Sequence, residues 1–179
     1  MKKYMDENFL LSNKASQRLY FDYAESLPII DYHSHLPPNE IAEDLQYDNL
    51  THVWLRGDHY KWRAMRTFGI NEAYITGDKP DKDKFLKWAE TVPNTLRNPL
   101  YDWTHLELKR YFGINDLLSS KNAEAVYENA GEQLKTSSHT ARGLMKQMKV
   151  EISCTTDDPI DDLAYHQKIR ESGFEIRVL

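Results

Sequence analysis

Apolar and polar positions follow two different rhythms along this chain, and the changes of rhythm mark its organisation. Residues 27–32 are largely apolar and β-branched, and Pro37-Pro38 then removes two hydrogen-bond donors, so a short buried strand is predicted to end there. Residues 150–155 alternate between apolar and polar types, which is the period of a strand. Residues 174–179 begin a third stretch of strand character.

Outside these strands the apolar spacing changes to the three- and four-residue period of amphipathic helices, and most of the predicted helices lie between the first two strands. Capping side chains start these helices, and Gly or Pro residues end them. We expect Ser12, Asn39, Asp58 and Asp158 to act as caps. The predicted helices are 12–25, 39–45, 49–54, 59–68, 81–91, 99–112, 121–134, 140–148 and 159–172.

Strand, helix and strand at the spacing of residues 150–179 form a βαβ unit, which requires parallel strands and a right-handed crossover. The predicted fold class is therefore α/β, as the start of a (β/α)₈ barrel that is helix-rich overall. We divide the chain into an N-terminal helical segment, a first strand with a metal-site loop, a helical insertion, and a second strand, helix and third strand; the ranges are 1–26, 27–38, 39–148 and 149–179.

The length of the chain is short for that fold. A (β/α)₈ barrel takes about 250 residues, whereas this chain has 179 and its third strand pattern continues to Leu179. We therefore expect the chain to be an N-terminal fragment of a longer protein, with the rest of the barrel absent.

Composition narrows the possible partners and location. A net charge of −5 and a pI near 5.8 argue against nucleic acid or an anionic membrane as the main partner. No stretch of the sequence approaches 18 apolar residues, so no membrane span is predicted. Cys154 is the single cysteine, which rules out an intramolecular disulfide framework and favours the cytoplasm.

His33 and His35 are the candidate metal ligands. Because side chains alternate along a strand, Asp31, His33 and His35 are predicted to share one face, where two imidazoles can converge on one divalent ion. The end of a barrel strand is also where such folds keep their chemistry. With 7 histidines in the chain, an accidental His-x-His is the alternative, with ordinary surface or core roles for both.

His59 and Tyr60 form the second candidate site. Gly57 and Asp58 set a turn and a helix cap, which places the pair on a first helical turn, where free N–H groups and the helix dipole favour an anion. The alternative is a plain amphipathic helix, with its aromatic residues in the core and its charges in water.

Three motifs together resemble the uronate (glucuronate) isomerase family of the amidohydrolase superfamily, whose members are metal-dependent (β/α)₈ barrels. The motifs are Asp31-Tyr32-His33-Ser34-His35-Leu36, Arg56-Gly57-Asp58-His59-Tyr60-Lys61-Trp62-Arg63 and Cys154-Thr155-Thr156-Asp157-Asp158-Pro159. The first is shared across the superfamily, and the other two are more specific to this family. The resemblance covers essentially all 179 residues.

The resemblance implies interconversion of D-glucuronate with D-fructuronate, and of D-galacturonate with D-tagaturonate, through a cis-enediol. It implies that His33 and His35 bind a divalent metal ion such as zinc or manganese, that His59 contacts a substrate hydroxyl, and that Tyr60 takes part in proton transfer. The partner is then a small-molecule sugar acid, and we expect a cytoplasmic homo-oligomer. The family's remaining ligand and substrate arginines would follow Leu179, so this chain alone is expected to be inactive and to bind metal weakly.

Two other functions remain open on the residues alone. One is a metal-dependent hydrolase of the same superfamily, and the other is a non-enzymatic helical binding module in which the histidine pair is incidental. The acidic group Asp157, Asp158, Asp161 and Asp162 is interpreted as helix capping rather than as a metal site.

Overall fold

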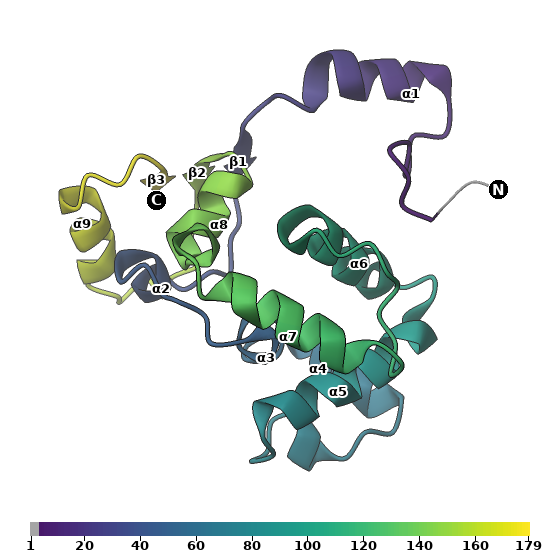
Figure 1. The fold of residues 1–179 in the computed structure, drawn as a ribbon. Helices are drawn as coiled ribbons and strands as arrows, with labels where there is room; N and C mark the ends of the chain where they lie inside the picture. The colour runs from purple at the N-terminus through teal and green to yellow at the C-terminus, as the bar shows by residue number, and fades with distance from the viewer. Residues whose placement is uncertain (1–3) are drawn as a thin grey trace. The chain divides into compact units, whose positions relative to one another are not determined.

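The computed structural model describes residues 4–179 as two compact units (Figure 1). The first unit comprises Met1–Glu43 and Met145–Leu179, and the second comprises Asp44–Leu144. The first unit is thus built from two stretches of chain that the second unit separates. Among the described residues no helix is long and apolar enough to cross a membrane.

The first unit contains a three-stranded sheet of β1 (Ile29–Asp31), β2 (Val150–Ser153) and β3 (Arg177–Val178). All pairings are parallel in the order β1-β2-β3, and Ile152 pairs with Ile30 on one side and Arg177 on the other. Helix α9 (Ala164–Glu171) connects β2 to β3. The predicted α/β class and its parallel βαβ unit are therefore confirmed, and Figure 1 shows the three strands side by side.

The expected burial of the first strand is wrong. Its predicted range of residues 27–32 shrinks to the three residues of β1, and the side chains of Ile29 and Ile30 are 47% and 60% exposed. Within the described residues β1 has one strand partner, so nothing in the first unit covers this apolar edge.

The small core of the first unit lies between helices and the sheet. It consists of buried residues from α2 (Pro38–Ala42), the end of α8 (Ala141–Gln147), α9 and the position just before β3: Ile41, Ala42, Met145, Ile169 and Ile176. An ion pair between Lys168 and Glu43 ties α9 to the end of α2. Towards the N-terminus, α1 (Lys14–Leu19) continues into one π-helical turn, Tyr20–Ala24, and neither buries a side chain.

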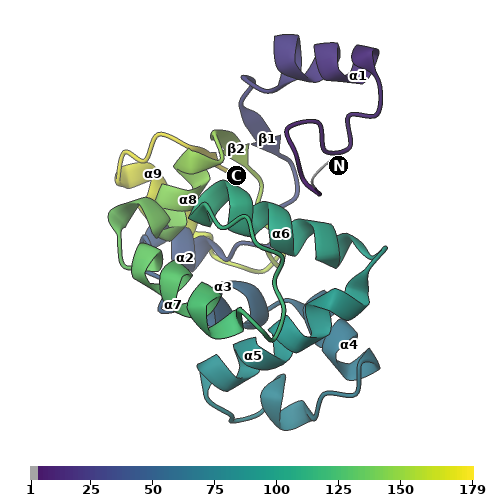
Figure 2. The ribbon, with the colours of Figure 1, turned by 45° about the vertical axis from the view of Figure 1, so that its right-hand side comes forward.

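The second unit is helical, and three of its helices pack around α5 (Asp81–Thr91), as Figure 2 shows. They are α3 (Leu50–Leu55), α4 (His59–Thr67) and α7 (Ala123–Leu134). Helix α6 (Pro99–Phe112) packs on the short 3₁₀ turn Val92–Thr95 and adds Leu100, Leu108 and Phe112 to the same core. Two further 3₁₀ turns are Glu72–Tyr74 and Ser137–His139. Phe85 and Trp88 are fully buried, and the ring of Phe85 stacks on Trp54 at 6.1 Å between centroids.

The predicted helix boundaries agree with the structure at some helices and differ at others, depending on which residue caps the helix. The range of α5 and that of α6 are as expected, and Gly113 ends α6 with a φ of 65°. Asn13 rather than Ser12 caps α1, because the Asn13 carboxamide accepts the Ser16 N–H. Pro37, which offers no side-chain cap, precedes α2 in place of the expected Asn39.

The helix expected from residue 159 begins only at Ala164. The reason is local competition, because the nearby carboxylates accept backbone N–H groups within a turn. Asp158 accepts from Ile160 N at 3.1 Å, and Asp161 accepts from Asp158 N at 2.9 Å. The expected helix cap at Asp158 is therefore wrong, because Asp158 and Asp161 accept backbone N–H groups within a turn and Leu163 precedes α9 without a side-chain cap.

Candidate functional site

The histidine pair lies just past the carboxyl end of β1, in the first unit. β1 ends at Asp31, so His33 and His35 do not stand on a regular strand, and the predicted alternation of faces does not reach them. Their rings nevertheless converge: Nε2 of His33 is 2.9 Å from Nε2 of His35, and the ring planes are 77° apart. Both side chains are exposed, so the paired nitrogen atoms are open to solvent.

This donor set fits a shared divalent ion as two of its ligands. Nitrogen ligands about 2.05 Å from one ion are roughly 2.9 Å apart at right angles and about 3.3 Å apart in a tetrahedron. The observed 2.9 Å lies at the lower end of that range. Among residues 4–179 no group of three or more His, Cys, Asp or Glu side chains is placed to hold a metal, whereas catalytic zinc has three protein ligands. The described chain therefore offers two of the ligands that such an ion needs.

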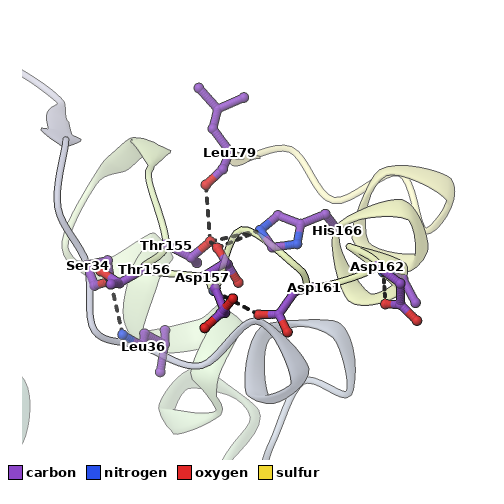
Figure 3. Close-up of polar contacts among 11 residues, drawn as sticks. Ser34, Leu36, Thr155, Thr156, Asp157, Asp161, Asp162, His166 and Leu179 are labelled. Atoms are coloured by element: carbon purple, nitrogen blue, oxygen red, sulfur yellow. Dashed lines mark hydrogen bonds and ion pairs between the residues drawn. The ribbon is translucent and has the colours of Figure 1, made fainter.

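Ser34, between the two histidines, is held by the segment that follows β2. Ser34 N donates to the carbonyl oxygen of Cys154 at 2.7 Å, and Thr156 Oγ1 donates to the Ser34 carbonyl at 3.0 Å. The hydroxyl of Ser34 accepts the Leu36 N–H at 3.1 Å, and Ser34 itself is buried (Figure 3). These bonds take the place of the strand pairing that β1 lacks beyond Asp31.

Thr155, Asp157 and His166 form a polar cluster beside this segment. Thr155 Oγ1 lies 2.6 Å from Asp157 Oδ2 and 2.8 Å from His166 Nε2 (Figure 3). A hydroxyl has one hydrogen, so when Thr155 donates to the carboxylate, His166 Nε2 must donate to Thr155. The side chains of His166 and Asp157 are only 10% and 19% exposed.

One hollow of about 330 Å³ in the first unit is lined by His35 of the histidine pair and by Asp157 and His166 of the cluster. Because all three follow or face the carboxyl ends of parallel strands, this is the side of the sheet where α/β proteins bind ligands.

His59 and Tyr60 occupy the first turn of α4 in the second unit, as predicted. Asp58 caps the helix: its Oδ1 accepts the N–H groups of Tyr60 and Lys61 at 2.9 and 3.1 Å. The rings of His59 and Tyr60 lie 4.4 Å apart, and both side chains are exposed. The two residues therefore present adjacent proton-carrying groups to solvent from a fixed helical turn.

Tyr60 borders a cavity of about 700 Å³ within the second unit. Arg63 and Trp103 line the same cavity, and the guanidinium carbon of Arg63 lies 5.7 Å from the centre of the Tyr60 ring. Arg56 instead contacts the ring of His52. Of these two arginines, Arg63 is thus the cationic neighbour of the phenol.

Charged side chains lie beside the first turn of α4. Lys61 is 7% exposed, and its Nζ donates to Asp58 Oδ2 at 2.5 Å. Burial raises the pKa of Asp58, but the Lys61 side chain and the two backbone N–H groups outweigh it, and the pKa lies below its ordinary value. Burial also raises the pKa of Glu107, and there it outweighs the opposing charge of Lys61.

The grouping of His166 with Thr155 and Asp157 was not predicted from the sequence. The available signal was weak: a hydroxyl and a carboxylate two positions apart after β2, and a histidine in the first turn of the next helix. His105 and His139 have ordinary core roles, because each bonds a backbone carbonyl, of Tyr101 and Tyr111 respectively.

Comparison with known proteins gives one consistent match. A family model described as glucuronate isomerase matches residues 1–179. The uronate isomerase of Shouchella clausii is 58% identical over 172 residues, which is 96% of this chain and 36% of that protein. The uronate isomerase of Bacteroides thetaiotaomicron is 57% identical over 180 residues, covering 100% of this chain and 38% of that protein. The chain therefore spans little more than a third of the length of these relatives.

Solved structures agree. The crystal structure of uronate isomerase from Thermotoga maritima matches with a TM-score of 0.94 and 38% identity, over 99% of this chain and 39% of that one. The glucuronate isomerase structure from Caulobacter crescentus matches with a TM-score of 0.88 over 99% of this chain and 39% of that one. Its identity is 24%, so that likeness concerns the fold.

Proposed function

The chain belongs to the glucuronate isomerase family, and we propose that it forms the N-terminal part of a uronate isomerase. The reaction is the aldose–ketose interconversion of D-glucuronate with D-fructuronate, and of D-galacturonate with D-tagaturonate. The observation that carries the proposal is the convergence of His33 Nε2 and His35 Nε2, 2.9 Å apart at the carboxyl end of β1.

The architecture proposed for the complete protein is a (β/α)₈ barrel. Its first three strands are β1, β2 and β3, and residues 39–148 are a helical insertion between the first two. Three parallel strands in sequence order with a helical crossover support this arrangement, since a barrel adds its strands in that order. The insertion carries His59 and Tyr60 on α4.

His33 and His35 would hold one divalent ion, of which zinc and manganese suit imidazole ligands. A bound ion would supply positive charge to attract the substrate carboxylate and to stabilise negative charge that develops on the sugar oxygens. Because two ligands make an open site, further ligands would come from residues outside this chain.

Tyr60 and His59 would act on the substrate itself. Isomerisation moves one proton from C2 of the aldose to C1 through a cis-enediol, and a second proton passes from the hydroxyl at C2 to the oxygen at C1. We assign proton transfer to the Tyr60 hydroxyl and a hydrogen bond to a substrate hydroxyl to His59. Their exposure on a capped helical turn, with Arg63 beside the phenol, supports these roles.

The expected partners follow from the same chemistry. The substrate is a small sugar acid, and the expected assembly is a homo-oligomer. The exposed apolar side chains of β1 would be covered by the remaining strands of the proposed barrel. A cytoplasmic location suits a chain whose single cysteine is Cys154.

The test is an isomerase assay on the complete protein, meaning this chain continued to the length of its relatives. We expect ketose formation from D-glucuronate by NMR, and Tyr60→Phe should lower kcat at least about a hundredfold, the scale of a lost proton-transfer group. Tyr23→Phe is a matched control, because Tyr23 is 59% exposed and Tyr60 is 56% exposed.

His33→Asn and His35→Asn should each abolish stoichiometric zinc or manganese binding in the complete protein, while His52→Asn should leave it intact. If His33→Asn and His35→Asn each turn over substrate at the wild-type rate, the proposed metal site is overturned. The 179-residue chain by itself is expected to show no turnover.

Neither alternative function gains support. The relatives compared above are isomerases, and no observation favours a hydrolase or a non-enzymatic helical module.

A further inference from the structure

The segment that carries the histidine pair has no regular secondary structure of its own. β1 ends at Asp31, and α2 begins at Pro38. Within it, Ser34 is the buried residue, while His33 and His35 on either side are exposed. The relative position of the two rings therefore depends on how the backbone of Ser34 is held.

The contacts that hold Ser34 come from Cys154 and Thr156, of which Thr156 is 122 positions later in the chain. One is a backbone bond, from Ser34 N to the Cys154 carbonyl at 2.7 Å, which continues the pairing of β1 with β2. The other is a side-chain bond, from Thr156 Oγ1 to the Ser34 carbonyl at 3.0 Å. Thr156 thereby fixes the peptide plane that leads directly into His35.

Thr156 is itself held from both sides. Its neighbours Thr155 and Asp157 bond each other and His166 Nε2, at 2.6 and 2.8 Å from the Thr155 hydroxyl. The Thr155 N–H also donates to the Leu179 carbonyl at 2.9 Å, after the end of β3. The Thr155 hydroxyl lies 3.1 Å from the same carbonyl oxygen (Figure 3). The hydroxyl of Thr156 is thus carried on a loop that is pinned to β3 and to α9.

We propose that Thr156 is a positioning residue for the proposed metal site, and that the Thr155–Asp157–His166 cluster keeps its hydroxyl in place. In this role Thr156 acts through His35 rather than as a ligand itself. It acts by orienting the Ser34–His35 peptide so that both Nε2 atoms can reach one ion, and this inference rests on the proposed function. Partners that orient metal ligands commonly change metal affinity by 10- to 100-fold when they are removed.

The experiment compares Thr156→Val, which keeps the shape and removes the hydroxyl, with Thr156→Ser, which keeps the hydroxyl. In the complete protein, cobalt(II) titration followed by its visible absorption should show about tenfold weaker binding for Thr156→Val, with an altered spectrum. Thr156→Ser should restore both. Thr67→Val is the matched control, because the Thr67 hydroxyl also donates to a backbone carbonyl, that of Arg63 on α4.

A second readout does not depend on the metal. In the metal-free protein, the Ser34 amide should exchange its hydrogen several-fold faster in Thr156→Val than in wild type, with an unchanged unfolding temperature. Asp157→Asn should have the same effect to a smaller degree, because the Asn side chain accepts the Thr155 hydrogen bond more weakly than a carboxylate does.

The outcomes separate the two proposals. Wild-type cobalt affinity, spectrum and Ser34 exchange in Thr156→Val would overturn the positioning role and leave the proposed function standing. If the cobalt spectrum of His33→Asn is the same as that of the wild type, the proposed metal site is overturned, and the positioning role with it. Failure of Thr156→Ser to restore cobalt affinity would also overturn the role, because it would attribute the loss to something other than the hydroxyl.

Discussion

The carboxylate of Asp58 supports the turn that carries His59 and Tyr60, and its substitution separates hydrogen bonding from charge. Oδ1 accepts the N–H groups of Tyr60 and Lys61, and Oδ2 accepts from Lys61 Nζ. Asp58→Asn keeps an oxygen for the cap but loses the negative charge, whereas Asp58→Ala loses both.

The magnitudes follow from these two roles. Loss of a helix N-cap costs about 1 kcal/mol of unfolding free energy. A hydrogen bond to a charged group contributes about 1.5–3 kcal/mol, and Lys61 is buried enough for the upper part of that range to apply. We therefore expect Asp58→Asn to cost about 2.5 kcal/mol and Asp58→Ala about 3.5 kcal/mol.

Acid should reduce the difference in unfolding free energy between wild type and Asp58→Asn. Because the pKa of Asp58 in the folded protein lies below its ordinary value of 3.8, the stabilisation is complete well above that pH and is lost as the pH falls through the folded-state pKa. The gap in unfolding free energy between wild type and Asp58→Asn should thus be largest near neutral pH and shrink in acid.

Urea unfolding of the complete protein, followed by tryptophan fluorescence, measures both effects. Asp162→Asn is the matched control: Asp162 also accepts a local N–H, from Ala164 at 2.9 Å, but it is exposed. Its substitution should change the free energy by less than about 0.5 kcal/mol. Equal unfolding curves for wild type and Asp58→Ala, or a gap that does not depend on pH, would refute the reasoning.

Three further predictions concern the core, a buried carboxyl and the sheet edge. Phe85→Ala should lower the unfolding free energy by about 3–5 kcal/mol, because Phe85 is fully buried against Trp54; a loss below 1 kcal/mol in urea unfolding would contradict this. Burial raises the pKa of Glu107 above its ordinary value of 4.5. The wild-type protein should therefore lose unfolding free energy as the pH rises from 4.5 through the pKa that Glu107 has in the folded protein. Glu107→Gln should then be the more stable protein in thermal unfolding at pH 7 and show no gain at pH 4. The 179-residue chain should self-associate through the exposed edge of β1, and Ile30→Lys should reduce its mass in light scattering; a monomeric wild type would count against that contact.

The helices that could be predicted from the sequence are those whose boundaries depend on nearby residues. Asn98 before Pro99 and Gly113 after Phe112 determine α6 through a local cap and a left-handed glycine. The delayed start of α9 was not predictable in the same way, because Asp161 and Asp162 serve equally well as helix caps or as turn acceptors. Local pattern alone does not choose between those two uses.

In the candidate site, too, the features set by nearby residues could be predicted and those set by distant residues could not. The spacing of His33 and His35 predicted rings that could converge, and they do, although β1 stops before them. The bond from Thr156 to Ser34 depends on the register between β1 and β2, which is set by a pairing between distant parts of the chain. No local pattern contains that information, so the support of the site could not be predicted while its candidate ligands could.

The division of the first unit into two stretches has a consequence for how the protein folds. β1 leaves the ribosome early, yet its partner β2 emerges only after the whole of Asp44–Leu144 has been made. If the compact unit Asp44–Leu144 folds first, the chain between β1 and β2 is a folded body rather than a flexible loop. Each doubling of a flexible loop costs only about 0.6 kcal/mol in closure entropy, so the delay is chiefly kinetic. Until β2 emerges, the apolar side chains of Ile29 and Ile30 have no partner strand.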